Sequence, residues 1–170
     1  ALFSGIGTKI PLVALARVLP PLMAAAPALR PVLLVVAAVT MLFGIMAAFW
    51  QDDLRRLLGY SSVSQMGYIA MALAAGGVAG YEAAAYHVVS HGLIKALLFL
   101  AVGEAMLVAG TARVSELGGR RLPPVIGVTF LLASLGLGGV PPMPAFWSKF
   151  QVFTATAEAG YGWAAGVAVL

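Results

Sequence analysis

Long apolar runs alternate with short polar turns along the chain. A helix needs about 20 predominantly apolar residues to cross the hydrocarbon layer of a bilayer. These runs are apolar on every side, which is typical of membrane helices and not of barrel strands, where apolar and polar residues alternate. The pattern predicts an all-α fold, a polytopic transmembrane helical bundle in one domain over residues 1–170. The predicted spans lie at about 1–19, 32–50, 57–75, 83–109, 123–157 with a break near 138–144, and 160–170 in part.

Prolines, glycines and aspartates mark the expected ends of these spans. Pro20 and Pro21 predict the end of the first span, because proline lacks the N–H that a helix interior needs. Asp52 or Asp53 is a natural N-cap for the span that follows. The Gly-rich stretch at residues 76–80 predicts a turn. Residues 136–144 (GLGGVPPMP) predict the break, since no straight helix passes through two adjacent prolines flanked by several glycines.

Composition excludes a soluble domain and several kinds of site. The chain is 62% hydrophobic and 9% charged, with a mean hydropathy of +1.00, whereas soluble domains carry about 25% charged residues. The absence of cysteine rules out disulfides, iron–sulfur clusters and thiolate zinc sites within this chain. The net charge of +4 comes mainly from arginines between the spans, so we predict no nucleic-acid binding. Because the sequence begins and ends inside apolar runs, we expect an internal fragment of a longer protein.

Three ionisable side chains lie inside the apolar run at 83–109. His87, His91 and Lys95 occur at i, i+4 and i+8, which places them on one flank of a helix, within roughly 80° and over about 12 Å. A cation at mid-membrane costs about 2.5–3.5 kcal/mol on insertion scales. These groups therefore either pair inside a bundle or move ions. A metal site from the two histidines is not predicted, because no third ligand appears at usable spacing.

Further ionisable residues extend this row. Lys149 follows the predicted break, and broken spans mark ion sites in transporters; the alternative is a charge at a helix end. Lys9 lies within the first span; the alternative is a lysine that snorkels to the interface. Glu104 either pairs with a cation on another helix or ends a path. Lysine and histidine can exchange protons when burial and neighbouring charges tune them. We predict a proton path built from these residues: Lys9, His87, His91, Lys95 and Lys149, with Glu104 as a further candidate.

Arginine positions predict the orientation. Two arginines follow the second span and three follow the fourth, whereas the loops on the other side hold only Arg30. The positive-inside rule therefore places the turn from Asp53 to Arg56 and the loop from Arg113 to Arg121 in the cytoplasm, with the protein in the cell (inner) membrane.

Three stretches resemble motifs of one family. Residues 53–68 (DLRRLLGYSSVSQMGY), 87–100 (HVVSHGLIKALLFL) and 139–149 (GVPPMPAFWSK) resemble, in order and spacing, the antiporter-like subunits of respiratory complex I. The same subunits occur in multisubunit Na⁺/H⁺ antiporters and membrane-bound hydrogenases. The resemblance covers essentially the whole chain. Arg55 stands where the family often has lysine, and Gly59 where alanine is usual.

The resemblance implies a fold and roles for the site residues. The family has about fourteen helices with two inverted five-helix repeats, each containing a broken helix. This chain would then be the second repeat plus the preceding helix. Lys9 would end the first half-channel, Lys95 with His87 and His91 would form the central relay, and Lys149 would be the broken-helix lysine. The stretch around Lys9 also resembles the lysine of the first broken helix, but its spacing from Arg55 (55 − 9 = 46 residues) favours the later lysine.

We therefore predict a proton-translocating membrane subunit of an NADH:quinone oxidoreductase-type, redox-driven complex. The chain itself is expected to hold no cofactor and to perform no redox chemistry. Its expected partners are other membrane subunits, the lipid bilayer, and protons or Na⁺. One alternative is a subunit of a multisubunit cation/proton antiporter without a redox partner. The other is a structural membrane scaffold whose buried lysines and histidines only hold helices together.

Overall fold

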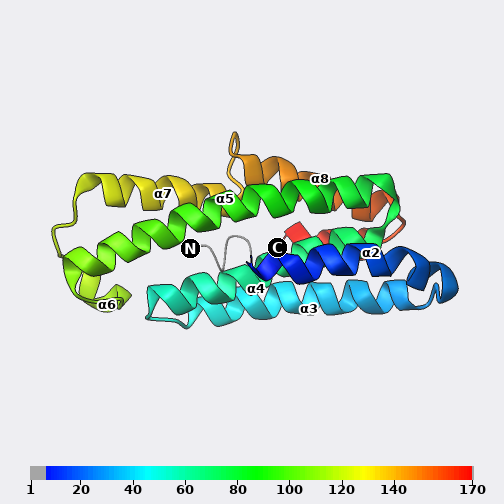
Figure 1. The fold of residues 1–170 in the computed structure, drawn as a ribbon, viewed down its shortest axis with the longest axis horizontal. Helices are drawn as coiled ribbons and strands as arrows, with labels where there is room; N and C mark the ends of the chain where they lie inside the picture. Colours follow the sequence, from blue (N-terminus) through cyan, green and yellow to red (C-terminus); the bar gives the residue numbers. More distant parts are fainter. Residues whose placement is uncertain (1–6, 170) are drawn as a thin grey trace.

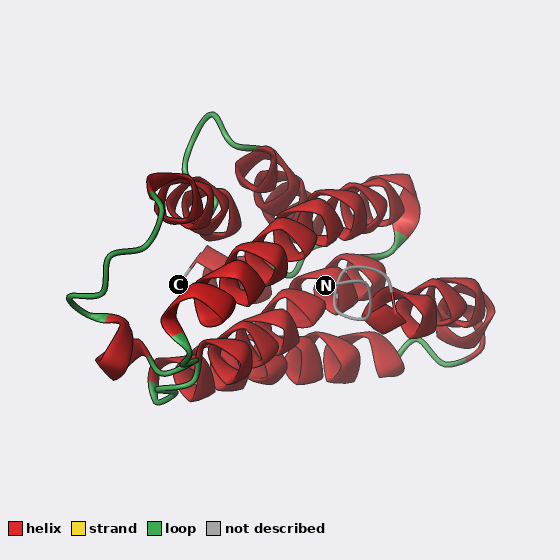
Figure 2. Cartoon of the chain, turned by 60° about the vertical axis from the view of Figure 1, so that its left-hand side comes forward, coloured by secondary structure: helices red, strands yellow, loops and turns green. Residues whose placement is uncertain are grey.

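The computed structural model describes residues 7–169, and this part of the chain is a bundle of helices without a β-sheet (Figures 1 and 2). The all-α prediction is confirmed. In Figure 1, α3 and α4 form one layer, and α5 forms a second layer with α7 and α8. The elements are η1 Gly7–Lys9, α2 Ile10–Ala25, α3 Leu29–Phe49, α4 Leu54–Ala75, α5 Gly77–Ala109, α6 Val114–Leu117, α7 Pro124–Gly138, α8 Pro144–Glu158 and α9 Gly162–Val169.

Three helical segments of the described chain are long and apolar enough to cross a membrane: Gly7–Ala25, Leu29–Phe49 and Gly77–Ala109. The helix α4 has 22 residues but carries arginines and serines in its first turns. The helices α7 and α8 have 15 residues each, so each is too short to cross alone. Which of these helices span a membrane stays a prediction, and residues 1–6 and 170 lie outside the described part.

The closest helix pair is α3 and α4. A Cβ atom added to Gly67 would lie 2.8 Å from the carbonyl oxygen of Ala37, and one added to Gly44 would lie 2.8 Å from the Cα of Ser64. Glycine at both positions lets the two backbones approach, which is a common device of membrane helix pairs. As a result α4 is buried over most of its length. Its buried polar side chains, those of Ser61, Ser62, Ser64 and Gln65, therefore lie within the bundle.

The structure corrects the predicted end of the first span. Instead of stopping at Pro20 and Pro21, the helix α2 continues to Ala25. Two prolines cost hydrogen bonds, but Leu19 and Met23 lie on the same side, one turn apart, and are 2% and 6% exposed. Their burial against the core offsets the lost bonds and keeps the segment helical.

The predicted turn at residues 76–80 is also shorter than expected. The helix α5 begins at Gly77, so Gly76 alone separates it from α4. Gly76 has a φ of 71°, in the left-handed region that favours glycine. Gly80 is already helical, and a Cβ there would lie 2.5 Å from the carbonyl oxygen of Ala72. The absence of side chains at both positions allows α5 to fold back directly onto α4.

The predicted break separates α7 from α8. Gly139, with a φ of 84°, ends α7, and its N–H and that of Val140 both donate to the Leu135 carbonyl at 3.2 Å. Pro144 then opens α8, at a position where its missing N–H costs nothing. In Figure 1 the two half-helices lie along opposite halves of α5, so the break falls near the middle of the bundle.

Two loops at one end of the bundle are joined by hydrogen bonds, an arrangement that we call the loop clasp (residues 52–54 with 112–115). The N–H of Leu54 donates to the Ala112 carbonyl at 3.0 Å, and the N–H of Val114 donates to the Asp52 carbonyl at 2.7 Å. The carboxylate of Asp52 also accepts from the N–H of Ser115 at 2.9 Å and from its hydroxyl at 2.7 Å. The α3–α4 turn and the α5–α6 loop therefore lie at the same end.

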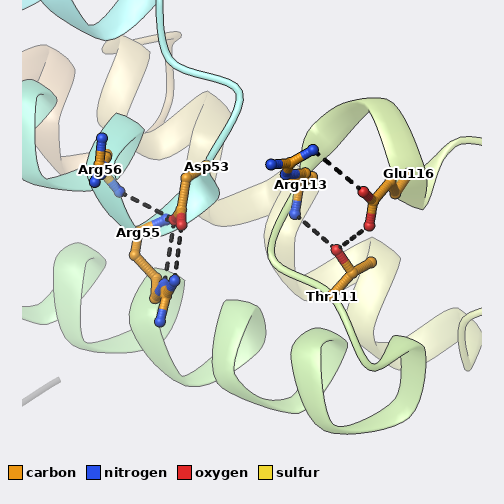
Figure 3. Close-up of polar contacts among 6 residues, drawn as sticks. All are labelled: Asp53, Arg55, Arg56, Thr111, Arg113 and Glu116. Carbon is orange, nitrogen blue, oxygen red and sulfur yellow. Dashed lines mark hydrogen bonds and ion pairs between the residues drawn. The ribbon is translucent and has the colours of Figure 1, made fainter.

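Charged side chains surround the loop clasp (Figure 3). Asp53 caps α4 by accepting from the backbone N–H groups of Arg55 and Arg56 at 2.8 and 3.4 Å. Its carboxylate also pairs with the Arg55 guanidinium at 2.8 Å. On the other side of the clasp, the Nη1 atom of Arg113 lies 3.6 Å from the Oε1 atom of Glu116. Capping by Asp53, one of the two predicted caps, starts α4 where the sequence suggested.

Replacing Asp52 by alanine is expected to lower the melting temperature of the detergent-solubilised protein by a few degrees at pH 7. The backbone N–H of Ser115, followed by its hydroxyl, holds the pKa of Asp52 below its usual value. A lowered pKa means that the carboxylate stabilises the folded state at neutral pH and that this stability is lost as the pH falls. The difference between variant and wild type, measured by thermal unfolding, should therefore shrink below about pH 4. A difference that stays constant down to pH 3 would contradict this origin.

Candidate functional site

The helix α5 carries His87, His91 and Lys95 on one buried flank, as the spacing predicted. Their side chains are 0%, 1% and 0% exposed. The two imidazole rings are nearly parallel, with centroids 6.0 Å apart and an interplanar angle of 4°. Because α5 is packed against α4 on one side and α7 and α8 on the other, the three groups lie in the interior and not against lipid.

Lys95 is held by the first turns of α4. Its Nζ donates to the Leu58 carbonyl at 2.7 Å and to the Ser61 hydroxyl. A lysine ammonium has three donors, so two are used by these partners. Both ion pairs given for the described residues lie in the loops around the clasp, and neither involves Lys95. The buried ammonium is therefore solvated by α4 and not neutralised by a carboxylate.

His87 connects three helices. Its Nδ1 lies 2.9 Å from the Ser148 hydroxyl on α8, and its Nε2 lies 3.1 Å from Gln65 Oε1 on α4. His91 differs, because both of its ring nitrogens are buried without a hydrogen-bond partner among the described residues. Buried polar atoms are nearly always hydrogen-bonded to protein or water. His91 is therefore an exception to this rule within the described part of the chain.

Lys149 lies in the first turns of α8, directly after the break. Its Nζ donates at 3.1 Å to the carbonyl of Gly138, which is the last residue of α7. The same Nζ lies 5.1 Å from the centroid of the Tyr68 ring. The Tyr68 ring in turn stacks on His87 at 5.6 Å. The lysine is thus positioned by a carbonyl at the end of α7 and by the face of the Tyr68 ring. The same ring contacts His87.

A cavity of about 450 Å³ lies between the two layers, next to Lys149. Its walls are mostly apolar, but they include hydroxyl, amide and ammonium groups from α4, α7 and α8. The polar lining residues are Ser61, Ser64, Gln65, Tyr68, Ser134 and Lys149. A cavity of this size with several polar partners has room for a chain of waters. It joins the surroundings of Lys95, through Ser61, to those of Lys149.

Lys9 and Glu104 are the outer members of the predicted set. Lys9 ends η1, just before α2, and is 4% exposed. Its charge acts on His87, His91 and Lys95. Glu104 is exposed on α5; nine residues beyond Lys95, at about 100° per residue, it lies on the opposite face. The structure brings the basic residues together and leaves Glu104 apart from them, and the roles of all these residues stay predictions.

Sequence reasoning did not assign Gln65, Ser61 or Ser148 to the site. Within α4, Ser61, Gln65 and Tyr68 follow each other at i, i+4 and i+7, which places them along one stripe of the helix. That stripe was the available signal. No such signal marked Ser148, whose contact with His87 spans 61 residues. Among the described residues, no group of three or more His, Cys, Asp or Glu side chains could hold a metal ion.

Known proteins resemble this chain over most or all of its length. A subunit of the Na⁺/H⁺ antiporter of Alkalihalophilus pseudofirmus is 32% identical over 157 residues, which cover 91% of this chain and 32% of that protein. The chloroplastic NAD(P)H-quinone oxidoreductase subunit 5 of Chaetosphaeridium globosum is 39% identical over 147 residues, covering 81% of this chain and 21% of its own length. The structure of the Mrp complex from Dietzia sp. contains a chain that superposes with a TM-score of 0.92 at 34% identity, over 99% of this chain and 32% of that one.

The present sequence thus spans between about a fifth and a third of these relatives. A family model described as "NADH:quinone oxidoreductase/Mrp antiporter, TM" matches residues 1–170. The motifs that suggested the resemblance are the ones that form the buried row, the break and the α4 stripe. The chain belongs to the NADH:quinone oxidoreductase/Mrp antiporter family of multi-pass membrane proteins.

Proposed function

We propose that this chain is part of a proton-translocating membrane subunit of an NADH:quinone oxidoreductase-type complex. Protons would pass along the basic residues Lys9, His87, His91, Lys95 and Lys149, of which Lys149 is half-buried and the others are buried. The observation that carries the proposal is the burial of His87, His91 and Lys95 in one row, outside the ion pairs of the described residues and close to a cavity with polar groups in its lining. The chain performs no redox chemistry in this proposal, and partner subunits supply the driving reaction.

The hydrogen bonding of these groups supports transport over a purely structural role. Structural buried charges are paired and fully hydrogen-bonded, because an unpaired charge costs several kcal/mol of folding free energy. Here His91 has no partner among the described residues, and Lys95 is held by two uncharged oxygens. Histidines and lysines that only held helices together would have all of their hydrogen-bonding groups paired. Groups that change their protonation state need partners that tolerate both states, such as carbonyls, hydroxyls and water.

Charge coupling gives the row a stepwise mechanism. The charges of Lys9 and Lys149 both act on His87 and His91. Gain or loss of a proton at either lysine therefore changes the proton affinity of the histidines between them. A proton added at one end of the row favours release at the next group, which moves charge along the bundle without a large helix motion.

A second candidate is a subunit of a cation/proton antiporter without a redox partner. It is favoured by the similarity to the Na⁺/H⁺ antiporter protein of Alkalihalophilus pseudofirmus and to a chain of the Mrp complex. In both proposals other membrane subunits and the lipid bilayer are the partners. The clasp end, which carries Arg55, Arg56 and Arg113, would face the cytoplasm of a cell (inner) membrane, following the positive-inside rule.

One experiment separates the two candidates. The full-length subunit is purified with the proteins that accompany it and placed in sealed vesicles with a pH-sensitive dye inside. Addition of NADH or another electron donor with a quinone should acidify the vesicle lumen if the complex is redox-driven. A Na⁺ gradient without electron donor should do so if it is an antiporter. Absence of proton movement under both conditions would leave the scaffold alternative.

Replacing Lys149 by methionine is expected to lower the rate of proton movement in these vesicles by at least about tenfold, the lower range for loss of a proton-transfer group. Methionine keeps an apolar side chain of similar length but removes the ammonium that lies over the Tyr68 ring. Lys149→Glu should retain more transfer than Lys149→Met if the position needs a titratable group. The control is Arg121→Met, which removes an exposed cation from a loop. Wild-type rates in Lys149→Met would contradict a role for this lysine.

A further inference from the structure

Ser148 has three polar neighbours in the interior of the bundle. Its hydroxyl oxygen lies 2.9 Å from His87 Nδ1 and 3.1 Å from the Ala145 carbonyl, and it accepts a hydrogen bond from the Ser90 hydroxyl at 3.2 Å. The residue is 0% exposed and Ser90 is 4% exposed. The single hydroxyl proton of Ser148 can point either to the imidazole or to the carbonyl, but not to both.

We propose that Ser148 is a positioning residue for His87, which adjusts its hydroxyl to the protonation state of the ring. This inference rests on the proposed role of His87 in proton transfer. Gln65 Oε1 lies 3.1 Å from Nε2 and accepts a hydrogen bond from the N–H at that nitrogen. Nδ1 is then the atom at which the ring gains or loses a proton, and it faces Ser148.

The hydroxyl satisfies the ring in both states. When His87 is neutral, Nδ1 has a lone pair, and the Ser148 hydroxyl donates to it. When Nδ1 carries a proton, the N–H donates to Ser148 Oγ, whose own proton turns to the Ala145 carbonyl. Ser90 can donate to the same oxygen or to the His87 carbonyl at 3.3 Å, so it adapts to either arrangement. No buried polar atom of this group loses its partner when the ring changes charge.

Ser148 and His87 belong to different helices, so their contact joins α8 to α5. It lies in the first turns of α8, next to Lys149, whereas His87 is on α5. The hydroxyl thus links the ring to the half-helix that carries the lysine. His91, one turn along α5, has no hydrogen-bond partner among the described residues, so no protein group there adapts to its protonation state. His87 can change its protonation state without rearranging water, because its partners rotate in place.

Two hydroxyl deletions on α8 test the proposal in the complete complex. Ser148→Ala removes the adaptable partner of His87. Thr156→Val is the matched control, because Thr156 is equally buried but bonds only to the Val152 carbonyl of its own helix at 2.7 Å. Ser148→Ala should lower proton transfer in vesicles by about 3–10-fold, the effect of one buried hydrogen bond. Ser148→Thr, which restores a hydroxyl, should recover most of the rate, and Thr156→Val should match the wild type.

The pH profile of proton transfer distinguishes positioning from packing. In Ser148→Ala the profile should shift along the pH axis, because the two states of His87 are no longer solvated equally, while Thr156→Val only rescales it. In a His87→Gln background, Ser148→Ala should add no further loss to the remaining rate. A profile that coincides with the wild type after scaling overturns the proposal. If His87→Gln and Lys95→Met also leave proton transfer unchanged, the proposed function itself is wrong. If these two variants abolish transfer while Ser148→Ala has no effect on the profile, only the proposed role of Ser148 is wrong.

Discussion

Replacement of Lys95 by methionine is expected to lower proton transfer by about 100-fold, within the range that a positioned proton-transfer group contributes. The lysine is fully buried near the middle of α5, and its ammonium donates to the Leu58 carbonyl and the Ser61 hydroxyl. Methionine fills nearly the same volume but cannot hold a proton. The measurement is dye-monitored proton movement in vesicles that contain the complete complex, normalised to the amount of assembled subunit.

Two control variants separate charge from proton exchange at this position. Lys95→Arg keeps a positive charge but cannot be deprotonated in proteins, so it should transfer protons as poorly as Lys95→Met. Arg56→Met removes an exposed cation at the start of α4, whose backbone N–H alone contacts Asp53, and should leave transfer unchanged. Wild-type transfer in both Lys95 variants would show that the ammonium only ties α5 to α4. Wild-type transfer in Lys95→Arg alone would mean that a fixed charge is sufficient.

Alanine at Gly44 or Gly67 is expected to destabilise the bundle by about 1–3 kcal/mol each, the usual cost of overpacking. At Gly67 the added Cβ would lie 2.8 Å from the Ala37 carbonyl oxygen and 2.9 Å from the Met41 nitrogen. These are backbone atoms, so relief requires α3 and α4 to separate. Separation would also displace Ser61 and Gln65 from their partners on α5. Thermal unfolding in detergent and the yield of folded subunit measure the effect.

Gly59 provides the matched control on the same helix. A Cβ at Gly59 meets no atom within 4 Å, so Gly59→Ala should be neutral or stabilising, since alanine is the better helix former. Gly67→Ala and Gly59→Ala thus make the same chemical change in one helix with opposite expected signs. Equal stability of the two variants would contradict close backbone approach as the reason for glycine at Gly67.

Much of the fold followed from local patterns. The apolar runs predicted the helices, because a segment that is apolar on every side favours a helix, whose backbone hydrogen bonds are satisfied within the segment itself. The row of His87, His91 and Lys95 was predictable for the same reason, since residues four apart share a face within one helix. The break before α8 followed from adjacent prolines and glycines. The predicted stop at Pro20 and Pro21 was wrong, because burial of Leu19 and Met23 depends on distant residues that a local rule does not include.

The sequence by itself determined the class of the molecule, the helix that holds the titratable row, and the position of the break, because these depend on composition and on spacing within single helices. Only the tertiary structure decided what surrounds each titratable group. Gln65, Ser148 and the Leu58 carbonyl come from other helices, 22, 61 and 37 residues away along the chain from the groups they contact. Their approach depends on how closely the helices pack, as at Gly80 of α5, where a Cβ would lie 2.5 Å from the Ala72 carbonyl oxygen of α4. Helix periodicity describes one helix at a time, so it cannot specify such contacts.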